Sequence, residues 1–457
     1  MFIDMDKIEI LDGLIVFNPW IMTINLILLL GFFYSWYNDY KKTGWKLNVW
    51  HLSLFMGIGI PFFLLYPFCA SYMNVFSTGN AYIDIGKYVE LAYMITITGY
   101  ICILIGGKFA TINISKAERY DFFEKILYTN ICRGFALKIL MVACIVFFLL
   151  SGVLSFSAGM PFNGRGWFLT NPAYRFIGNF FSSLYPLVFL YMGLRILTNK
   201  KKIYKDIILL VLSFISGLCW GSRGVLFGSL VSVLLYWLYL HKNVSLKKII
   251  FYGVVVIIGV MMMAELRSGE SLGSNFFTER LLLNIFYGNS FSDCRDFAWM
   301  LTGFSNDMYR LGATYIAGIT AFLPSSLFPF RHEYAVGIWS LELAGIADPT
   351  GEHPGLRGGM FFEIYLNFSI IGVMIWGTLY GWFLRKADLW TRFFIDTKHD
   401  SINAYIKQYP MIIIGAFSIT AGMFNLYVFF ALHALCLILN MIPYILNHSV
   451  YRKKELN

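Results

Sequence analysis

The chain has 457 residues, of which 58% are hydrophobic and 14% are charged, and its formal net charge is +10. Soluble domains usually carry about 25% charged residues, so this composition excludes an ordinary soluble protein. The positive charge does not indicate a nucleic-acid partner, because the lysines flank apolar runs and no basic domain holds them. The seven cysteines are scattered without a CxxC pair, so neither a disulfide framework nor a zinc site is indicated.

Apolar runs of about 20 residues recur along the whole chain, which is typical of a polytopic membrane protein. The predicted fold class is all-α, with about 11 transmembrane helices in one integral membrane domain over residues 1–457. In chain order the predicted spans are 14–37, 48–69, 87–106, 138–157, 177–197, 206–221, 224–240, 249–266, 359–384, 408–425 and 427–447. One long broken helix is the alternative for the last two. An acidic segment precedes the first run, which favours a retained span over a cleaved signal.

Lysines cluster in the loops between these runs, which indicates the cytoplasmic side. The N-terminus is then expected outside and the C-terminus inside, with a small outer loop at 158–176 and a large one at 267–358. The large loop is too aromatic and apolar for a linker, so it predicts short folded helices.

Residues 249–384 contain no lysine but six arginines: Arg267, Arg280, Arg295, Arg310, Arg331 and Arg357. The planar fork of arginine grips phosphate with two hydrogen bonds, whereas lysine acts as a point charge. This set therefore predicts a phosphate-bearing substrate on the outer face.

Shorter outer segments also carry arginines beside glycines. Arg223 lies between two glycines on a tight hairpin, where a functional role is favoured over snorkelling toward headgroups. Arg165 and Arg175 lie in the loop 158–176, near aromatic residues. They are candidates for gripping an anion or stacking on a sugar, and ordinary juxtamembrane charge is the alternative.

Within the large loop, Arg295 and Asp296 are neighbours. Adjacent residues on a helix point about 100° apart, so the two are predicted to meet a partner loop or a ligand rather than each other. A structural ion pair is the alternative. Further on, Arg331 and Glu333 follow a proline–serine stretch and indicate the edge of a site, with a solvated turn as the alternative.

The strongest candidate precedes the ninth predicted span and contains Glu352, His353 and Arg357 among glycines. Near neutral pH an imidazole acts as a base or hydrogen-bonds a phosphate. The glycines are expected to let backbone approach a bulky anion, and the following helix adds its positive dipole end. A satisfied helix cap is the alternative. Glu363 is an ionisable residue at membrane depth, with Arg357 as its candidate partner.

No HExxH or P-loop motif occurs, which argues against a metal-dependent protease and a nucleotide-fuelled pump. No metal or other cofactor is expected.

Several motifs follow one another in a defined order: Arg295-Asp296-Phe297-Ala298-Trp299, Tyr315, Ala317-Gly318, Phe322-Leu323-Pro324-Ser325-Ser326, Phe330-Arg331, Glu352-His353-Pro354-Gly355-Leu356-Arg357-Gly358-Gly359 and Glu363. In order and spacing they resemble the long periplasmic loop of the bacterial O-antigen polymerases of the Wzy type, or oligosaccharide repeat unit polymerases. Gly221-Ser222-Arg223 resembles an earlier element of that family.

The resemblance implies a GT-C-like glycosyltransferase in the bacterial inner membrane, acting at its periplasmic face. Donor and acceptor would both be oligosaccharides on undecaprenyl pyrophosphate, with inversion at the anomeric carbon. A chain-length-determining co-polymerase is implied as a partner, beside membrane lipid.

The expected catalytic residues are His353, Glu352, Arg357 and Arg331, with His353 as the first choice of base. The expected pyrophosphate-binding residues are Arg223, Arg295, Arg165 and Arg175, and the supporting ones are Asp296, Glu333 and Glu363. An O-antigen ligase, which transfers the same donor to lipid A-core, is the nearest alternative. A lipid-linked oligosaccharide flippase is less favoured because of the long outer loop.

Overall fold

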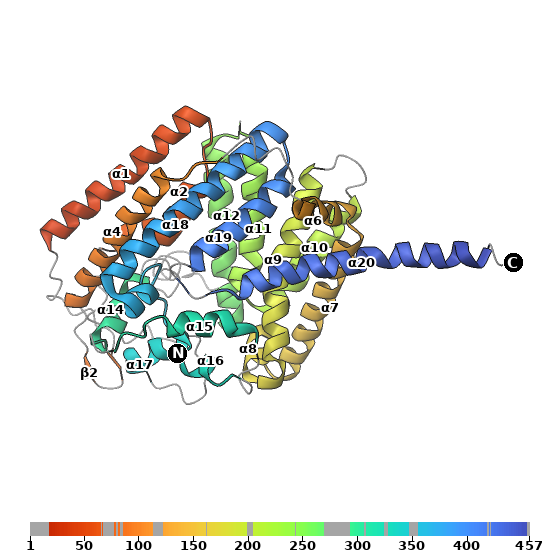
Figure 1. Ribbon diagram of the computed structural model, residues 1–457. Coiled ribbons are helices and arrows are strands. Elements are labelled where there is room, and N and C mark those ends of the chain that lie inside the picture. Colours follow the sequence, from red (N-terminus) through yellow and green to blue (C-terminus); the bar gives the residue numbers. More distant parts are fainter. Residues whose placement is uncertain are drawn as a thin grey trace. The chain divides into compact units, whose positions relative to one another are not determined.

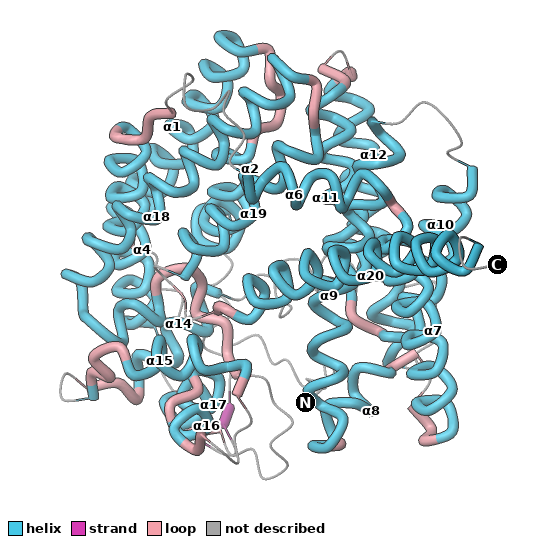
Figure 2. Tube along the Cα trace, turned by 45° about the vertical axis from the view of Figure 1, so that its right-hand side comes forward, coloured by secondary structure: helices cyan, strands magenta, loops and turns pink. Residues whose placement is uncertain are grey.

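A computed structural model gives the structure of the protein. It describes residues 18–64, 66, 77–78, 81–82, 86–112, 122–160, 162–198, 204–242, 244–268, 293–305, 308–323, 328–346, 355–417, 420 and 422–454. Nearly all of them are helical, as Figure 2 shows. Among them, only β1 (Ser77–Thr78) and β2 (Ala81–Tyr82) are strands, paired antiparallel with Ser77 opposite Tyr82. The predicted all-α class is confirmed.

Six of the described helices are long and apolar enough to cross a membrane. They lie in α1 (Pro19–Thr43), α4 (Gly86–Lys108), α7 (Phe135–Ser157), α9 (Pro172–Thr198), α18 (Phe362–Lys398) and α20 (Phe424–Lys454). Two shorter apolar helices cover Val49–Leu64 and Gly224–Leu240. These helices support a polytopic membrane protein. The count of about 11 spans, the identity of the membrane and the side of each terminus stay predictions.

Contacts divide the chain into two compact units. The first comprises Met1–Thr111, Ser274–Asp388 and Met411–Phe424, and the second comprises Ile112–Gly273, Leu389–Pro410 and Asn425–Asn457. The helix α19 (Ser401–Phe417) and the long helix α18 each contribute residues to both units.

The first unit begins with α1, whose start is set by local chemistry. Asn18 caps it by accepting the backbone N–H of Trp20 (3.1 Å), and Pro19 follows at a position where no N–H is needed. Along this helix Leu26, Ile27 and Leu30 are each more than half exposed. Such an unpartnered apolar side is what a lipid-facing helix presents. The helices α2 (Val49–Leu54) and η2 (Phe55–Leu64) follow, and α4 runs alongside the first part of α18 in Figure 1, with Gly106 of α4 close to Thr378 of α18.

The described part of the predicted large outer loop folds into short helices that belong to the first unit. They are α14 (Asp293–Thr302), α15 (Ala313–Ile319), η6 (Thr320–Phe322), α16 (Phe330–Glu333) and α17 (Val336–Leu343). Residues 294–301 of α14 are all buried, because this helix packs on α4, η2 and α17. A short buried helix of this kind provides a rigid support for the loops around it.

The second unit consists of α6 (Phe122–Arg133), α7, α8 (Gly164–Thr170), α9, α10 (Tyr204–Trp220), α11 (Arg223–Leu240) and α12 (Leu246–Ser268), with parts of the later helices. Here α10 packs along α7, and α11 packs along α9. A buried ionic group joins these helices: Asp206 lies 2.8 Å from Lys138 Nζ and 3.7 Å from Arg195 Nη2. Arg195 also donates to the carbonyl of Ile131 (3.1 Å), near the end of α6. Arg195 is thus a structural arginine.

Candidate functional site

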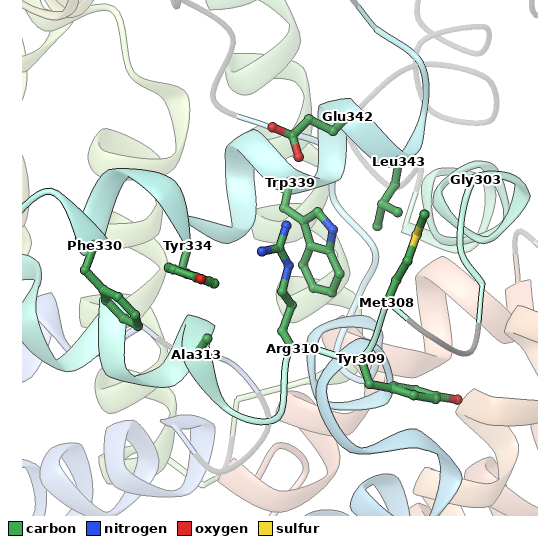
Figure 3. A pocket seen from close by; sticks show the side chains of 10 residues that line it. All are labelled: Gly303, Met308, Tyr309, Arg310, Ala313, Phe330, Tyr334, Trp339, Glu342 and Leu343. Atoms are coloured by element: carbon green, nitrogen blue, oxygen red, sulfur yellow. The ribbon is translucent and has the colours of Figure 1, made fainter.

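A cavity of about 590 Å³ opens among the short helices of the first unit (Figure 3). Its wall combines aromatic rings with one cation and one carboxylate. The lining residues include Tyr309, Arg310, Phe330, Tyr334, Trp339 and Glu342. They come from the loop before α15, from α16 and the residue after it, and from α17. Concave sites with aromatic walls and a few polar groups are the usual form of small-molecule sites.

The two faces of α17 have different neighbours. Successive helical residues are about 100° apart, so Trp339, Glu342 and Leu343 share the face that lines the cavity. Ser340 lies about 100° further round the helix from Trp339 and accepts the backbone N–H of Leu356 at 2.8 Å. This helix therefore contacts both the cavity and, through Ser340, the loop 355–359.

The guanidinium of Arg310 is held by aromatic rings. Its central carbon lies 4.8 Å from the centre of the Trp339 ring and 5.2 Å from that of Tyr334, and Figure 3 shows it between the two side chains. The backbone N–H of Arg310 donates to Leu366 (3.3 Å), which fixes the residue to α18. Within the described part of the chain, the guanidinium forms no ion pair. Cation–π contacts leave the N–H donors of the fork available to a ligand.

The rings around Arg310 are themselves braced by other rings. Phe330 stacks on Tyr334 with centroids 4.4 Å apart, and Phe304 contacts both Trp339 (6.4 Å) and Tyr309 (5.2 Å) edge-on. Such pairs favour fixed relative orientations. The cavity therefore offers flat apolar walls, one forked donor and one carboxylate acceptor, a combination suited to a polyhydroxylated ligand.

A second group of polar residues surrounds the start of α14. Both Nε and Nη2 of Arg295 donate to Oδ1 of Asp296 (3.2 and 3.1 Å), and the two residues are 4% and 5% exposed. The prediction that these neighbours do not pair with each other was wrong, and the structural ion pair is the interpretation that holds. The angle of about 100° separates the Cβ directions, but the long arginine side chain folds back to reach the adjacent carboxylate.

The other carboxylate oxygen of Asp296 accepts the backbone N–H of Arg357 at 3.4 Å, although the two residues are 61 positions apart. The Arg357 side chain is exposed. Asp293, one turn before Asp296, joins this group: burial first, and then the charge of Asp296, raise its pKa to about 7, while Arg357 opposes the shift. The structure thus brings Arg295, Asp296 and Arg357 together, with Asp293 as an unpredicted member.

The glycines around Arg357 pack against protein atoms. Gly355 (φ +98°) lies so close to the backbone of Gly337 that an added Cβ would approach it to 2.5 Å. Gly359 (φ +74°) is similarly close to the Phe62 ring, at 2.8 Å. These positions need glycine because of positive φ and close packing. The sequence led us to expect that these glycines let backbone approach an anion. In the structure, other protein atoms occupy the space beside them.

Glu363 is 2% exposed at the start of α18. It accepts a hydrogen bond from Thr314 Oγ1 (2.8 Å), and Thr314 in turn accepts one from Asn367 Nδ2 (2.9 Å). The Asn367 carbonyl oxygen accepts the backbone N–H of Gly312 (2.9 Å). The partner seen here is Thr314, whereas Arg357 was expected. This network ties the start of α15, and with it Arg310, to α18.

The remaining predicted residues are distributed as follows. Glu352 and His353 lie outside the described residues. Arg331 is on α16 and Arg223 begins α11, but nothing is described of their side chains; Glu333 is exposed on α16. Arg165 in α8 and Arg175 in α9 belong to the second unit, where Trp167 stacks on Tyr174 at 5.7 Å.

Among the residues that line the cavity, sequence reasoning placed Phe330 in a motif but did not single out Arg310 or Glu342. Arg310 belongs to the arginine-only set but sits in no motif, and Glu342 occurs in an apolar stretch. The available signal was the spacing of Trp339 and Glu342, three residues apart and so on one helical face.

Comparisons with protein-family models, with curated proteins and with solved structures found no match to this chain. The class of protein is therefore given by the structure alone. It is a helical protein, and several of the described helices are able to cross a membrane.

Proposed function

We propose that the protein is a membrane glycosyltransferase that polymerises oligosaccharide repeat units carried on undecaprenyl pyrophosphate into a surface polysaccharide. It acts at the periplasmic face of the bacterial inner membrane, and its mechanism is inverting and independent of metal. The observation that carries the proposal is the aromatic cavity in which the Arg310 guanidinium lies against Tyr334 and Trp339, with Glu342 beside them. The motif order in residues 295–363 supports the same assignment.

The reaction needs two kinds of assistance. The anomeric C–O bond to the donor pyrophosphate breaks, so negative charge develops on a leaving group that cations must stabilise. The acceptor sugar must present one hydroxyl to the anomeric carbon in a fixed orientation. The exposed side chain of Arg357 is suited to the first task. The walls of the Arg310 cavity are suited to the second, and α17 both lines this cavity and binds the loop that carries Arg357.

The test in cells is deletion of the gene in its native host, followed by electrophoresis of the lipopolysaccharide. Polymerase activity predicts collapse of the ladder to core plus a single repeat unit. Loss of every repeat unit, including the first, would point to the ligase or the flippase. An unchanged ladder would contradict all three assignments.

The test in vitro uses lipid-linked repeat units extracted from the deletion strain, incubated with the purified protein in detergent. Elongated lipid-linked oligomers and free undecaprenyl pyrophosphate should accumulate in parallel over time. Failure to form either product with protein of normal thermal stability would contradict the proposal.

A further inference from the structure

Glu342 is the acidic residue among those that line the Arg310 cavity. Its side chain is exposed on α17, one turn beyond Trp339, and Figure 3 shows its carboxylate above the Trp339 ring. Within the described part of the chain it forms no ion pair, and in particular none with Arg310. A cation and a carboxylate thus share one cavity without neutralising each other directly.

The two polar groups have opposite hydrogen-bonding capacities. Arg310 can only donate, and an ionised Glu342 can only accept. A sugar hydroxyl does both. A sugar ring in the cavity can therefore accept a hydrogen bond from Arg310 through one hydroxyl oxygen and donate one to Glu342 through another hydroxyl.

Two buried carboxylates of the first unit, by contrast, are already engaged. Asp296 is paired with Arg295 and also accepts the Arg357 backbone N–H. Glu363 accepts the Thr314 hydroxyl. Glu342 differs from both because it borders an open volume large enough for a sugar.

We infer that the cavity is the acceptor-sugar subsite and that Glu342 is the general base for glycosyl transfer, an inference that rests on the function proposed above. The acceptor hydroxyl gives its proton to the Glu342 carboxylate while its oxygen forms the new bond to the anomeric carbon of the donor. The anomeric C–O bond to phosphate breaks, and its electron pair leaves with undecaprenyl pyrophosphate. Arg310 orients the acceptor ring and does not exchange a proton.

The test compares Glu342→Gln, Glu342→Asp and the wild-type protein in the purified system, using lipid-linked repeat units from the deletion strain. Binding of the delipidated repeat-unit oligosaccharide is measured separately from turnover. Asp396→Asn is the matched control, because it also removes one carboxylate charge, here from a half-exposed ion pair with Lys242 in the second unit.

For Glu342→Gln we expect kcat to fall by about 10²–10⁴-fold, the usual contribution of general base catalysis, with oligosaccharide affinity within about threefold of wild type. Glu342→Asp should retain intermediate activity, and Asp396→Asn should match the wild type. Thermal unfolding should be unchanged in all three variants, since these side chains are exposed or half-exposed.

Three outcomes separate this inference from the proposed function. If the wild-type protein polymerises and Glu342→Gln is equally active, Glu342 is not the base. If Glu342→Gln loses binding and turnover in equal proportion, Glu342 serves only to bind sugar, and the inference is overturned while the polymerase stands. If the wild type binds the oligosaccharide but never elongates it, the proposed function itself fails, and the role of Glu342 as base fails with it.

Discussion

The carboxylate of Asp296 accepts two hydrogen bonds from Arg295 through one oxygen and the backbone N–H of Arg357 through the other. The two arginine side chains consequently have different surroundings, although the sequence places both in the arginine set that is predicted to meet a phosphate-bearing substrate. The Arg295 side chain forms a buried ion pair with Asp296. Arg357, in contrast, is held through its backbone N–H and exposes its side chain.

Arg295→Ala should destabilise the protein. It leaves the Asp296 carboxylate buried without its cation, and breaking a buried pair in this way typically costs about 3–5 kcal/mol. The measurement is thermal unfolding in detergent. The double variant Arg295→Ala/Asp296→Asn should recover part of the loss, because it removes the stranded charge. A single variant as stable as the wild type would show that the pair does not support α14.

Arg357→Ala should leave the free energy of unfolding within about 0.5 kcal/mol of the wild type, since the side chain is exposed. Polysaccharide length in cells should nevertheless fall sharply. Arg357→Lys should not restore it fully, because an ammonium lacks the planar fork. A normal ladder from the alanine variant, at normal protein level, would remove Arg357 from the site.

Asp293 should make stability depend on pH. Its folded-state pKa of about 7 lies above the ordinary value of 3.8, so the folded protein binds this proton more tightly than the unfolded chain does. The resulting stabilisation is full below about pH 4 and is lost as the pH rises to about 7. Asp293→Asn removes the charged form. It should therefore be more stable than wild type at about pH 8, by on the order of 1–3 kcal/mol, with a smaller gap near pH 5.

Thermal unfolding of both proteins across this pH range provides the measurement. A difference that stays constant with pH, or one that grows toward acid, would contradict the burial of an ionisable Asp293.

Arg310→Lys should weaken substrate binding even though the charge is kept. Lysine loses both the stacking on Trp339 and the fork that donates to a ligand, so KM should rise by about tenfold or more, equivalent to at least ~1.4 kcal/mol. Arg133→Lys is the control, being an exposed arginine at the end of α6. Equal KM values for the Arg310 variant and the wild type would exclude Arg310 from acceptor binding.

The amino-acid sequence by itself determines the helical class and the position of many helices. Apolar runs of membrane-spanning length are a local property, readable without knowledge of neighbours. The predicted run 138–157, for example, lies within α7, and 427–447 lies within α20. The expectation that residues 267–358 form short helices also follows from local composition, and the described part agrees with it.

Tertiary structure alone decided the contents of the candidate site. Whether Arg295 turns to Asp296 or to a ligand depends on what buries α14, and no spacing rule encodes that. Arg310 becomes part of the candidate site through its contacts with Tyr334 and Trp339, which lie 24 and 29 residues further along the chain. Periodicity shows which side chains share a face of α17, but only packing decides that Ser340 meets the loop 355–359 and that Trp339 and Glu342 line the cavity. The physical reason is that helix formation is governed by nearby residues, whereas a cavity is the space left by side chains that are distant in sequence.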